Sequence, residues 1–159
     1  MVSGFWALDP ATLATKGGGN NLPPNFGFGS DLWVVGNVAY SGNWGNGTGA
    51  EIAIWSLDAN GIPTLANTLI ISRATTMSDV AVSPNGRMLV GTVEGGTRNG
   101  LYVWDRTDPI HPVQVAYYPV AEGLHTAETK EVNGRTYVFA ARDPSKQALM
   151  IFDITDVVH

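Results

Sequence analysis

The sequence contains no cysteine, few basic residues and no long apolar run, and each absence excludes a class of protein. Without cysteine it has neither disulfides nor thiolate metal sites. Lysine and arginine number 9 against 14 aspartates and glutamates, and the net charge of −5 argues against a nucleic-acid surface. No stretch approaches the roughly 20 apolar residues of a membrane helix. We therefore expect no nucleic-acid partner and no membrane span.

The N-terminal residues also lack the basic and long apolar regions of a signal peptide. From this feature alone, we expect either a cytoplasmic protein or a mature or excised segment. The absence of cysteine does not decide between compartments.

The sequence is rich in turn-forming residues, with 19 glycines and 9 prolines, and its aromatic residues lie inside short apolar runs. This composition is typical of an all-β protein. One apolar segment recurs four times, at residues 4–10, 52–58, 101–112 and 149–156. The aromatic residues of the four copies, spaced 49, 49 and 48 residues apart, are Trp6, Trp55, Trp104 and Phe152. A period this regular predicts a repeat architecture.

Each period contains signals for four short antiparallel strands, which predicts the blades of a β-propeller. We expect outer strands of a first blade at 4–28, including a strand at 12–15 and an irregular connector from Gly17. The predicted remainder is a second blade at 29–75, a third at 76–122 and an incomplete fourth at 123–159. Closed propellers typically need 4–8 blades. We therefore expect the chain to form part of a longer propeller or to dock against other protein chains, rather than to be a well-behaved monomer.

Several of these segments resemble the LVIVD-repeat family of β-propellers. The resemblance lies in the strand and corner at 101–112, the strand at 149–156, and the hairpins at 36–40 and 132–138. It implies a β-propeller of bacterial or archaeal origin, located outside the cytoplasm in the periplasm or at the cell surface, with no settled chemistry. Trp104-Asp105 also resembles the WD40 dipeptide, but the sequences after Trp6 and Trp55 break that pattern.

Acidic residues lie near the predicted start of the innermost strand of three blades. They are Asp31, Asp79 and Glu128, and His125 lies just before the third. Together these groups can hold a divalent cation such as Ca²⁺, or act as general acid and base. The alternative is that the aspartates bond to nearby backbone and start the inner strand. Repetition favours this structural interpretation, because a catalytic residue rarely recurs in every blade.

Two single residues are further candidates for a binding site. His125 departs from the repeat, since Gly29 and Met77 occupy its position in the other blades. Trp44 lies among glycines and asparagines, where it can stack on a sugar ring or a partner side chain, or cover its own blade. The aspartates of the corner, Asp105 and Asp108, are expected to form Asx-type turns.

No catalytic motif is present, and the sequence assigns no catalytic residue. We expect a non-catalytic scaffold or binding module without a cofactor. The alternative is a metal-dependent propeller enzyme, a hydrolase or oxidoreductase, with a cation at the channel mouth.

Overall fold

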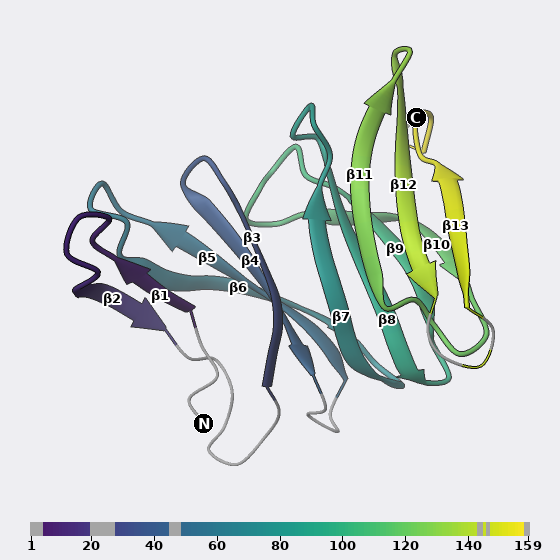
Figure 1. The fold of residues 1–159 in the computed structure, drawn as a ribbon, viewed down its shortest axis with the longest axis horizontal. Helices are drawn as coiled ribbons and strands as arrows, with labels where there is room; N and C mark the ends of the chain where they lie inside the picture. The colour runs from purple at the N-terminus through teal and green to yellow at the C-terminus, as the bar shows by residue number, and fades with distance from the viewer. Residues whose placement is uncertain (1–4, 20–27, 45–48, 143–144, 146, 158–159) are drawn as a thin grey trace.

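The computed structural model describes residues 5–19, 28–44, 49–142, 145 and 147–157, and these residues form strands and no helix. The all-β prediction is therefore confirmed, and no described helix is long and apolar enough to cross a membrane. The strands are β1 (Phe5–Leu8), β2 (Thr15–Gly19), β3 (Phe28–Val35), β4 (Val38–Trp44), β5 (Ala50–Leu57), β6 (Pro63–Ile71), β7 (Ala74–Val82), β8 (Met88–Gly96), β9 (Gly100–Asp105), β10 (Val113–Pro119), β11 (Thr126–Val132), β12 (Arg135–Arg142) and β13 (Ala148–Asp153) (Figure 1).

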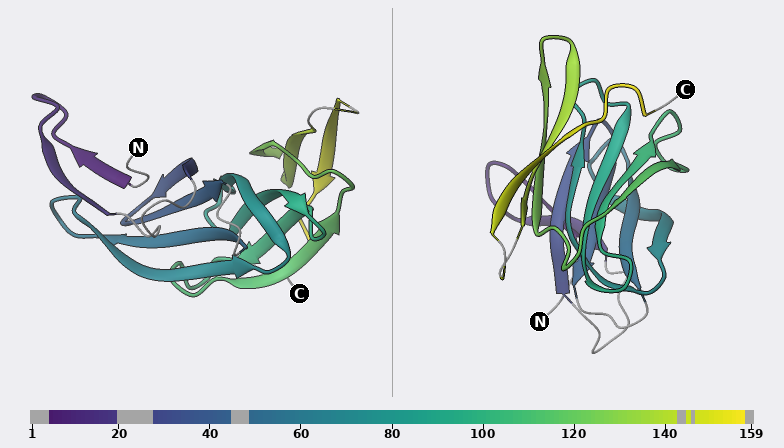
Figure 2. Two further views of the ribbon diagram at one scale, coloured as in Figure 1. Left: turned by 90° about the horizontal axis from the view of Figure 1, so that it is seen from below. Right: turned by 90° about the vertical axis from the view of Figure 1, so that its right-hand side faces the viewer.

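Consecutive strands pair antiparallel and form four groups. Strands β1 and β2 form a hairpin, β3–β6 a first meander, β7–β10 a second meander and β11–β13 a third. One residue pair, Trp44 with Thr76, links β4 to β7 and joins the first two meanders into one sheet. The sheet curls, with the β1–β2 hairpin at one end of the molecule and the third meander at the other (Figure 2).

The tight turns use residues that tolerate a left-handed backbone. Asn133 and Gly134 join β11 to β12 with φ angles of 52° and 75°, as a type I′ hairpin turn requires. Between β7 and β8, Gly86 has a φ of 75° and donates its N–H to the Ser83 carbonyl at 2.8 Å. Turn chemistry therefore fixes the register of both hairpins.

The predicted strand at 12–15 is wrong for residues 12–14, and the predicted connector is wrong for residues 17–19, while residues 20–27 lie outside the described residues. Strand β2 begins later and includes three glycines. Thr12 belongs to the preceding turn, because the Asp9 carboxylate accepts its N–H at 3.0 Å. Glycine suits β2 because a Cβ on Gly17 would lie 2.9 Å from the Cδ1 atom of Ile62.

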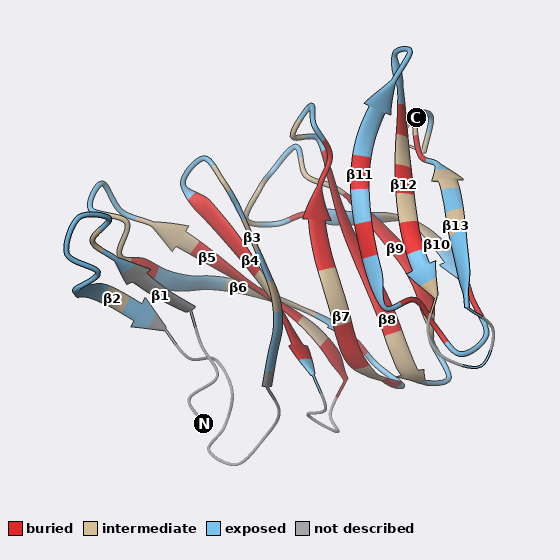
Figure 3. Cartoon of the chain, viewed as in Figure 1, coloured by how far each residue is buried: buried red, intermediate tan, exposed pale blue. Residues whose placement is uncertain are grey.

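Both faces of the second meander are buried. The first core lies between the first and second meanders and includes Val38, Tyr40, Ile52, Ile54, Val80, Leu89, Tyr102 and Trp104. The second core lies between the second and third meanders and includes Met88, Val90, Leu101, Val103, Ala127, Val138, Ala140 and Ile154. Strand β9 contributes alternate side chains to both cores, so its apolar run is buried on both sides (Figure 3).

The recurring aromatic residues lie in these cores, as predicted. Trp104 is buried in the first core, and Trp55 is buried in a smaller core with Ala39 and Ala53. Phe152 is half-buried against the second core. The side chain of Trp6 lies outside the described residues.

The corner after β9 docks the second meander onto the first. The Tyr40 hydroxyl donates to the Pro109 carbonyl at 2.7 Å and accepts the Arg106 Nε–H at 2.5 Å. The side-chain amide of Asn67 donates to the Ile110 carbonyl at 2.8 Å. These polar bonds fix the alignment of the two meanders around their apolar core.

The predicted Asx-type turns at this corner are confirmed. The Asp105 carboxylate accepts the backbone N–H of Thr107 at 2.8 Å, and the Asp108 carboxylate accepts that of Ile110 at 3.0 Å. These bonds lower the pKa of both carboxyl groups from the ordinary value, through the Thr107 side-chain and backbone bonds for Asp105 and the Ile110 bond for Asp108. The corner aspartates therefore have a structural role.

We predict that Trp104→Ala lowers the free energy of unfolding by about 3–5 kcal/mol, because it leaves a cavity in the first core. Trp44→Ala is the matched control, since the Trp44 side chain is 51% exposed, and it should change stability little. Chemical denaturation of both variants measures the difference. Equal losses would show that Trp44 is a core residue.

Candidate functional site

The candidate binding site is a pocket of about 250 Å³ between the start of β3, the middle of β7 and the point where the chain enters β11. Its lining residues, which define the Trp44–His125 pocket, are Gly29, Ser30, Trp44, Ser78, Glu94 and His125. All three meanders contribute to it. Two of the residues singled out from the sequence, Trp44 and His125, are thus brought together.

Trp44 is the last residue of β4, and its backbone pairs with Phe28 on one side and Thr76 on the other. Pairing on both sides fixes the backbone of Trp44, while half of its side-chain surface stays exposed at the pocket. An exposed indole on a fixed backbone offers a flat apolar surface for stacking.

Two serines at equivalent positions supply hydroxyl groups to the pocket. Each lies at a bulge, one in the β3–β4 ladder and one in the β7–β8 ladder. The Ser30 hydroxyl donates to the Met77 carbonyl. The Ser78 hydroxyl is buried and has no hydrogen-bond partner within the described residues, so it can bond to a bound molecule.

The polar wall of the pocket is formed by Glu94 and His125. The Nδ1 atom of His125 lies 3.0 Å from the Glu94 Oε1 atom. The backbone of His125 donates to the Ala141 carbonyl at 2.9 Å, which ties it to β12. Gly123 allows the segment before His125 to lie close to β8, because its φ is 91° and a Cβ there would lie 2.6 Å from the Glu94 Cβ.

Sequence reasoning missed Glu94, which lies near the end of β8. Strand β8 continues through it to Gly96. Glu94 pairs with Thr76 as Trp44 pairs with Phe28, so the two residues occupy equivalent ends of β4 and β8. Alignment of the second strand of each repeat would have found it.

Asp31 and Asp79 also lie together, but they link strands and do not line the pocket. The Val80 N–H lies 3.2 Å from the Asp31 Oδ2 atom and 3.0 Å from the Asp79 Oδ1 atom. The second oxygen of Asp79 accepts the Ala127 N–H of the third meander at 2.6 Å. Each aspartate therefore bonds to the first strand of the next meander, in agreement with the structural interpretation of these residues.

This proximity changes the acidity of Asp79. Burial, followed by the hydrogen bond and the charge of Asp31, raises the pKa of Asp79 to about 7. The backbone bonds from Ala127 and Val80 oppose the shift. A proton held between the two carboxyl groups reduces the repulsion between them.

Glu128 lies apart from both groups. It is exposed on β11 and stands opposite Phe139 of β12. The part of the chain that the structure describes contains no group of three or more histidine, aspartate or glutamate side chains placed to hold a metal ion.

Comparison of the sequence with protein-family models and with curated proteins gave no match.

We predict that Asp79→Asn keeps a bond to Ala127 but removes the titration of Asp79. Between about pH 4 and pH 7 the folded Asp79 holds a proton that the unfolded chain has lost, so this group makes stability fall as pH rises. The variant should therefore lose less stability than the wild type from pH 5 to pH 8. Asp156→Asn, at an exposed position, is the control and should follow the wild-type curve.

Asp79→Ala separates the role of charge from that of hydrogen bonding. It removes the acceptor of the Ala127 N–H and should cost about 1–3 kcal/mol. Urea denaturation across the pH series tests both substitutions. An Asn variant as unstable as the Ala variant at every pH would contradict this role for the carboxyl pair.

Proposed function

We propose that the chain is a section of a β-propeller that acts as a non-catalytic binding module. In this proposal the first and second meanders are complete blades, and the third supplies the inner strands of another. The observation that carries the proposal is the repeated link between first strands, in which Asp31 bonds to Val80 and Asp79 bonds to Ala127. First strands that lie side by side around an axis are what a propeller requires.

Two further bonds, which lie at different positions in the repeat, also join the first strands of neighbouring meanders. The Ser30 hydroxyl bonds to the Met77 carbonyl, and the Thr129 hydroxyl bonds to the Val82 carbonyl at 2.9 Å. Each pair is separated by 47 residues and joins the first strands of consecutive meanders.

The pairing of the last two strands is also the same in the first and second meanders. Trp55 stands opposite Leu65, and Trp104 stands opposite Gln114, with a bulge just beyond each pair. Equivalent bulges at equivalent tryptophans favour two copies of one structural unit. The proposed location outside the cytoplasm derives from the resemblance of the sequence to LVIVD repeats.

The proposed partner is another β-meander, from another protein chain or from more of the same propeller. On β13, Met150 and Phe152 pack toward the second core, so Leu149 and Ile151 lie on the opposite face, where they are 68% and 57% exposed. Leu32 of β3, in the first meander, is likewise exposed. A sheet packed as the first two meanders pack on each other would cover these apolar faces.

The proposed ligand site is the Trp44–His125 pocket. Its indole face, serine hydroxyls and carboxylate suit a polyhydroxylated ring such as a sugar, which stacks on aromatic residues and bonds to polar ones.

The alternative of a metal-dependent enzyme rests on the Asp31–Asp79 pair. Elemental analysis of the purified protein tests it. A stoichiometric divalent metal that is lost in Asp79→Asn would favour the enzyme, whereas metal-free protein with the wild-type fold favours the binding module.

We predict that the 159-residue chain associates in solution beyond its monomer mass of 16.9 kDa, because its end faces are apolar. Leu149→Lys should shift the chain toward monomer, since a charge on this face must be desolvated on association. Val113→Lys is the matched control, because Val113 is 65% exposed on an outer strand and should leave association unchanged.

Sedimentation equilibrium of the three proteins decides the question. A monodisperse wild-type monomer that unfolds cooperatively would overturn the proposed partner face. So would an equal effect of the two lysine substitutions.

A further inference from the structure

We propose that the chain carries a second site, which binds an oxyanion group. The site is a pocket of about 340 Å³ where the β6–β7 turn meets the β8–β9 loop. We call it the two-arginine pocket, and its polar lining residues are Ser72, Arg73, Arg98 and Gln114. It shares no lining residue with the Trp44–His125 pocket.

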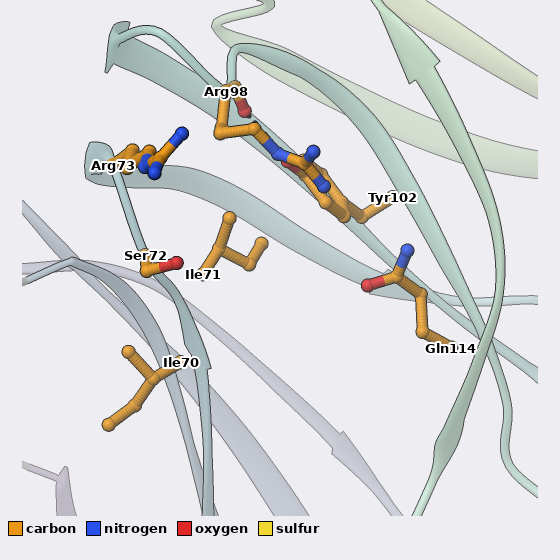
Figure 4. Close-up of a pocket in the computed structure, with 7 residues that line it drawn as sticks. All are labelled: Ile70, Ile71, Ser72, Arg73, Arg98, Tyr102 and Gln114. Atoms are coloured by element: carbon orange, nitrogen blue, oxygen red, sulfur yellow. Dashed lines mark hydrogen bonds between the residues drawn. The ribbon is translucent and has the colours of Figure 1, made fainter.

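Two arginines far apart in sequence meet at this pocket. Arg73 lies in the turn from β6 to β7, and Arg98 lies in the loop from β8 to β9. The Thr97 N–H donates to the Arg73 carbonyl at 2.8 Å, which fixes the turn against the loop. Figure 4 shows Ile71 between Arg73 on one side and Gln114 on the other, with Arg98 extending along the edge of the pocket.

The side chain of Arg98 is held in place before any ligand binds. Its guanidinium carbon lies 4.7 Å from the centroid of the Tyr117 ring, which is a cation–π contact. Its carbonyl accepts the Tyr102 hydroxyl at 2.8 Å, and the two tyrosine rings pack with centroids 4.5 Å apart. A cation fixed in this way loses little entropy when an anion binds.

Arg73 occupies a backbone conformation that does not suit it. Its φ is 65°, in the left-handed region that glycine and asparagine adopt more readily. The turn alone would be formed better by either of those residues. The strained position therefore points to a role for the side chain itself.

Neither arginine has its charge balanced by a neighbour. Arg87, Arg135 and Arg142 each form an ion pair with a carboxylate. Among the residues that the structure describes, Arg73 and Arg98 have no carboxylate partner. In a chain with a net charge of −5, two unbalanced cations at one pocket mark an exception.

The ligand chemistry follows from these groups. Guanidinium groups donate paired hydrogen bonds to phosphate, sulfate and carboxylate oxygens. The hydroxyl of Ser72 and the amide of Gln114 add further donors at the same pocket. Ile70 and Ile71 supply an apolar wall, which suits an oxyanion carried on an organic molecule.

The test measures thermal stabilisation of the 159-residue chain by inorganic phosphate, sulfate and acetate, each at ionic strength matched with sodium chloride. A ligand that binds only the folded state raises the unfolding midpoint in proportion to its affinity. We expect at least one oxyanion to raise the midpoint above that in chloride. A response to phosphate or sulfate that the arginine variants lose indicates a tetrahedral group, because these two anions also stabilise folded proteins without binding at a site. A response to acetate alone indicates a carboxylate.

Variants locate the effect. Arg73→Asn and Arg98→Gln should each weaken binding about tenfold or more, because each removes charge-assisted hydrogen bonds. In chloride, Arg73→Asn should be at least as stable as the wild type, since asparagine tolerates a positive φ, so its loss of binding is not a loss of fold. Arg87→Gln is the matched control, because Arg87 is exposed and pairs with Asp105 elsewhere.

Two results would overturn the site. One is the absence of stabilisation beyond chloride for all three anions. The other is an equal loss of stabilisation in Arg87→Gln and Arg73→Asn, which would reveal a general effect of net charge.

Discussion

The structure depends on hydrogen bonds between neighbouring meanders. In each, an aspartate on the first strand of one meander accepts a backbone N–H from the first strand of the following meander. An antiparallel meander has two faces, and the second meander buries both of them. Apolar packing is not directional, so it does not fix how far one meander slides or turns against its neighbour. The carboxylates of Asp31 and Asp79 add direction, because each reaches a particular N–H of the following meander. The cost is a half-buried pair of acids, which shows in the raised pKa of Asp79.

This arrangement also explains where the two pockets lie. Linked first strands bring the start of β3, the middle of β7 and the segment before β11 together, and the Trp44–His125 pocket forms there. The β6–β7 turn meets the β8–β9 loop, and the two-arginine pocket forms there. Both sites are thus consequences of stacking meanders, and each requires residues from more than one of them.

Much of the fold was predictable because its signals are local. The period of the tryptophans predicted that Trp55 and Trp104 lie in the core, and the Asn133-Gly134 pair predicted a hairpin turn. The error at β2 has a physical cause: glycines are poor strand formers, but pairing with β1 and the close approach of Ile62 favour them there. Local propensity does not include such tertiary contacts.

The sites were less predictable because they depend on distant contacts. The sequence singled out His125 and Trp44, which the structure brings together, but it gave no sign that Glu94 pairs with His125. It grouped Glu128 with Asp31 and Asp79, whereas Glu128 lies exposed on β11. The two-arginine pocket was missed because Arg73 and Arg98 carry no motif, and it is the pairing of Ala74 with Gly96 and the Thr97–Arg73 bond that bring them together.

Amide hydrogen exchange at Ala127 tests the central claim most directly. The Ala127 N–H bonds to the carboxylate of Asp79, in the neighbouring meander. If the first strands are linked in this way, the Ala127 amide is protected in the wild type and in Asp79→Asn, and loses protection in Asp79→Ala while the second-core amide of Val138 keeps it. Rapid exchange at Ala127 in the wild type, or unchanged protection in Asp79→Ala, would contradict the account.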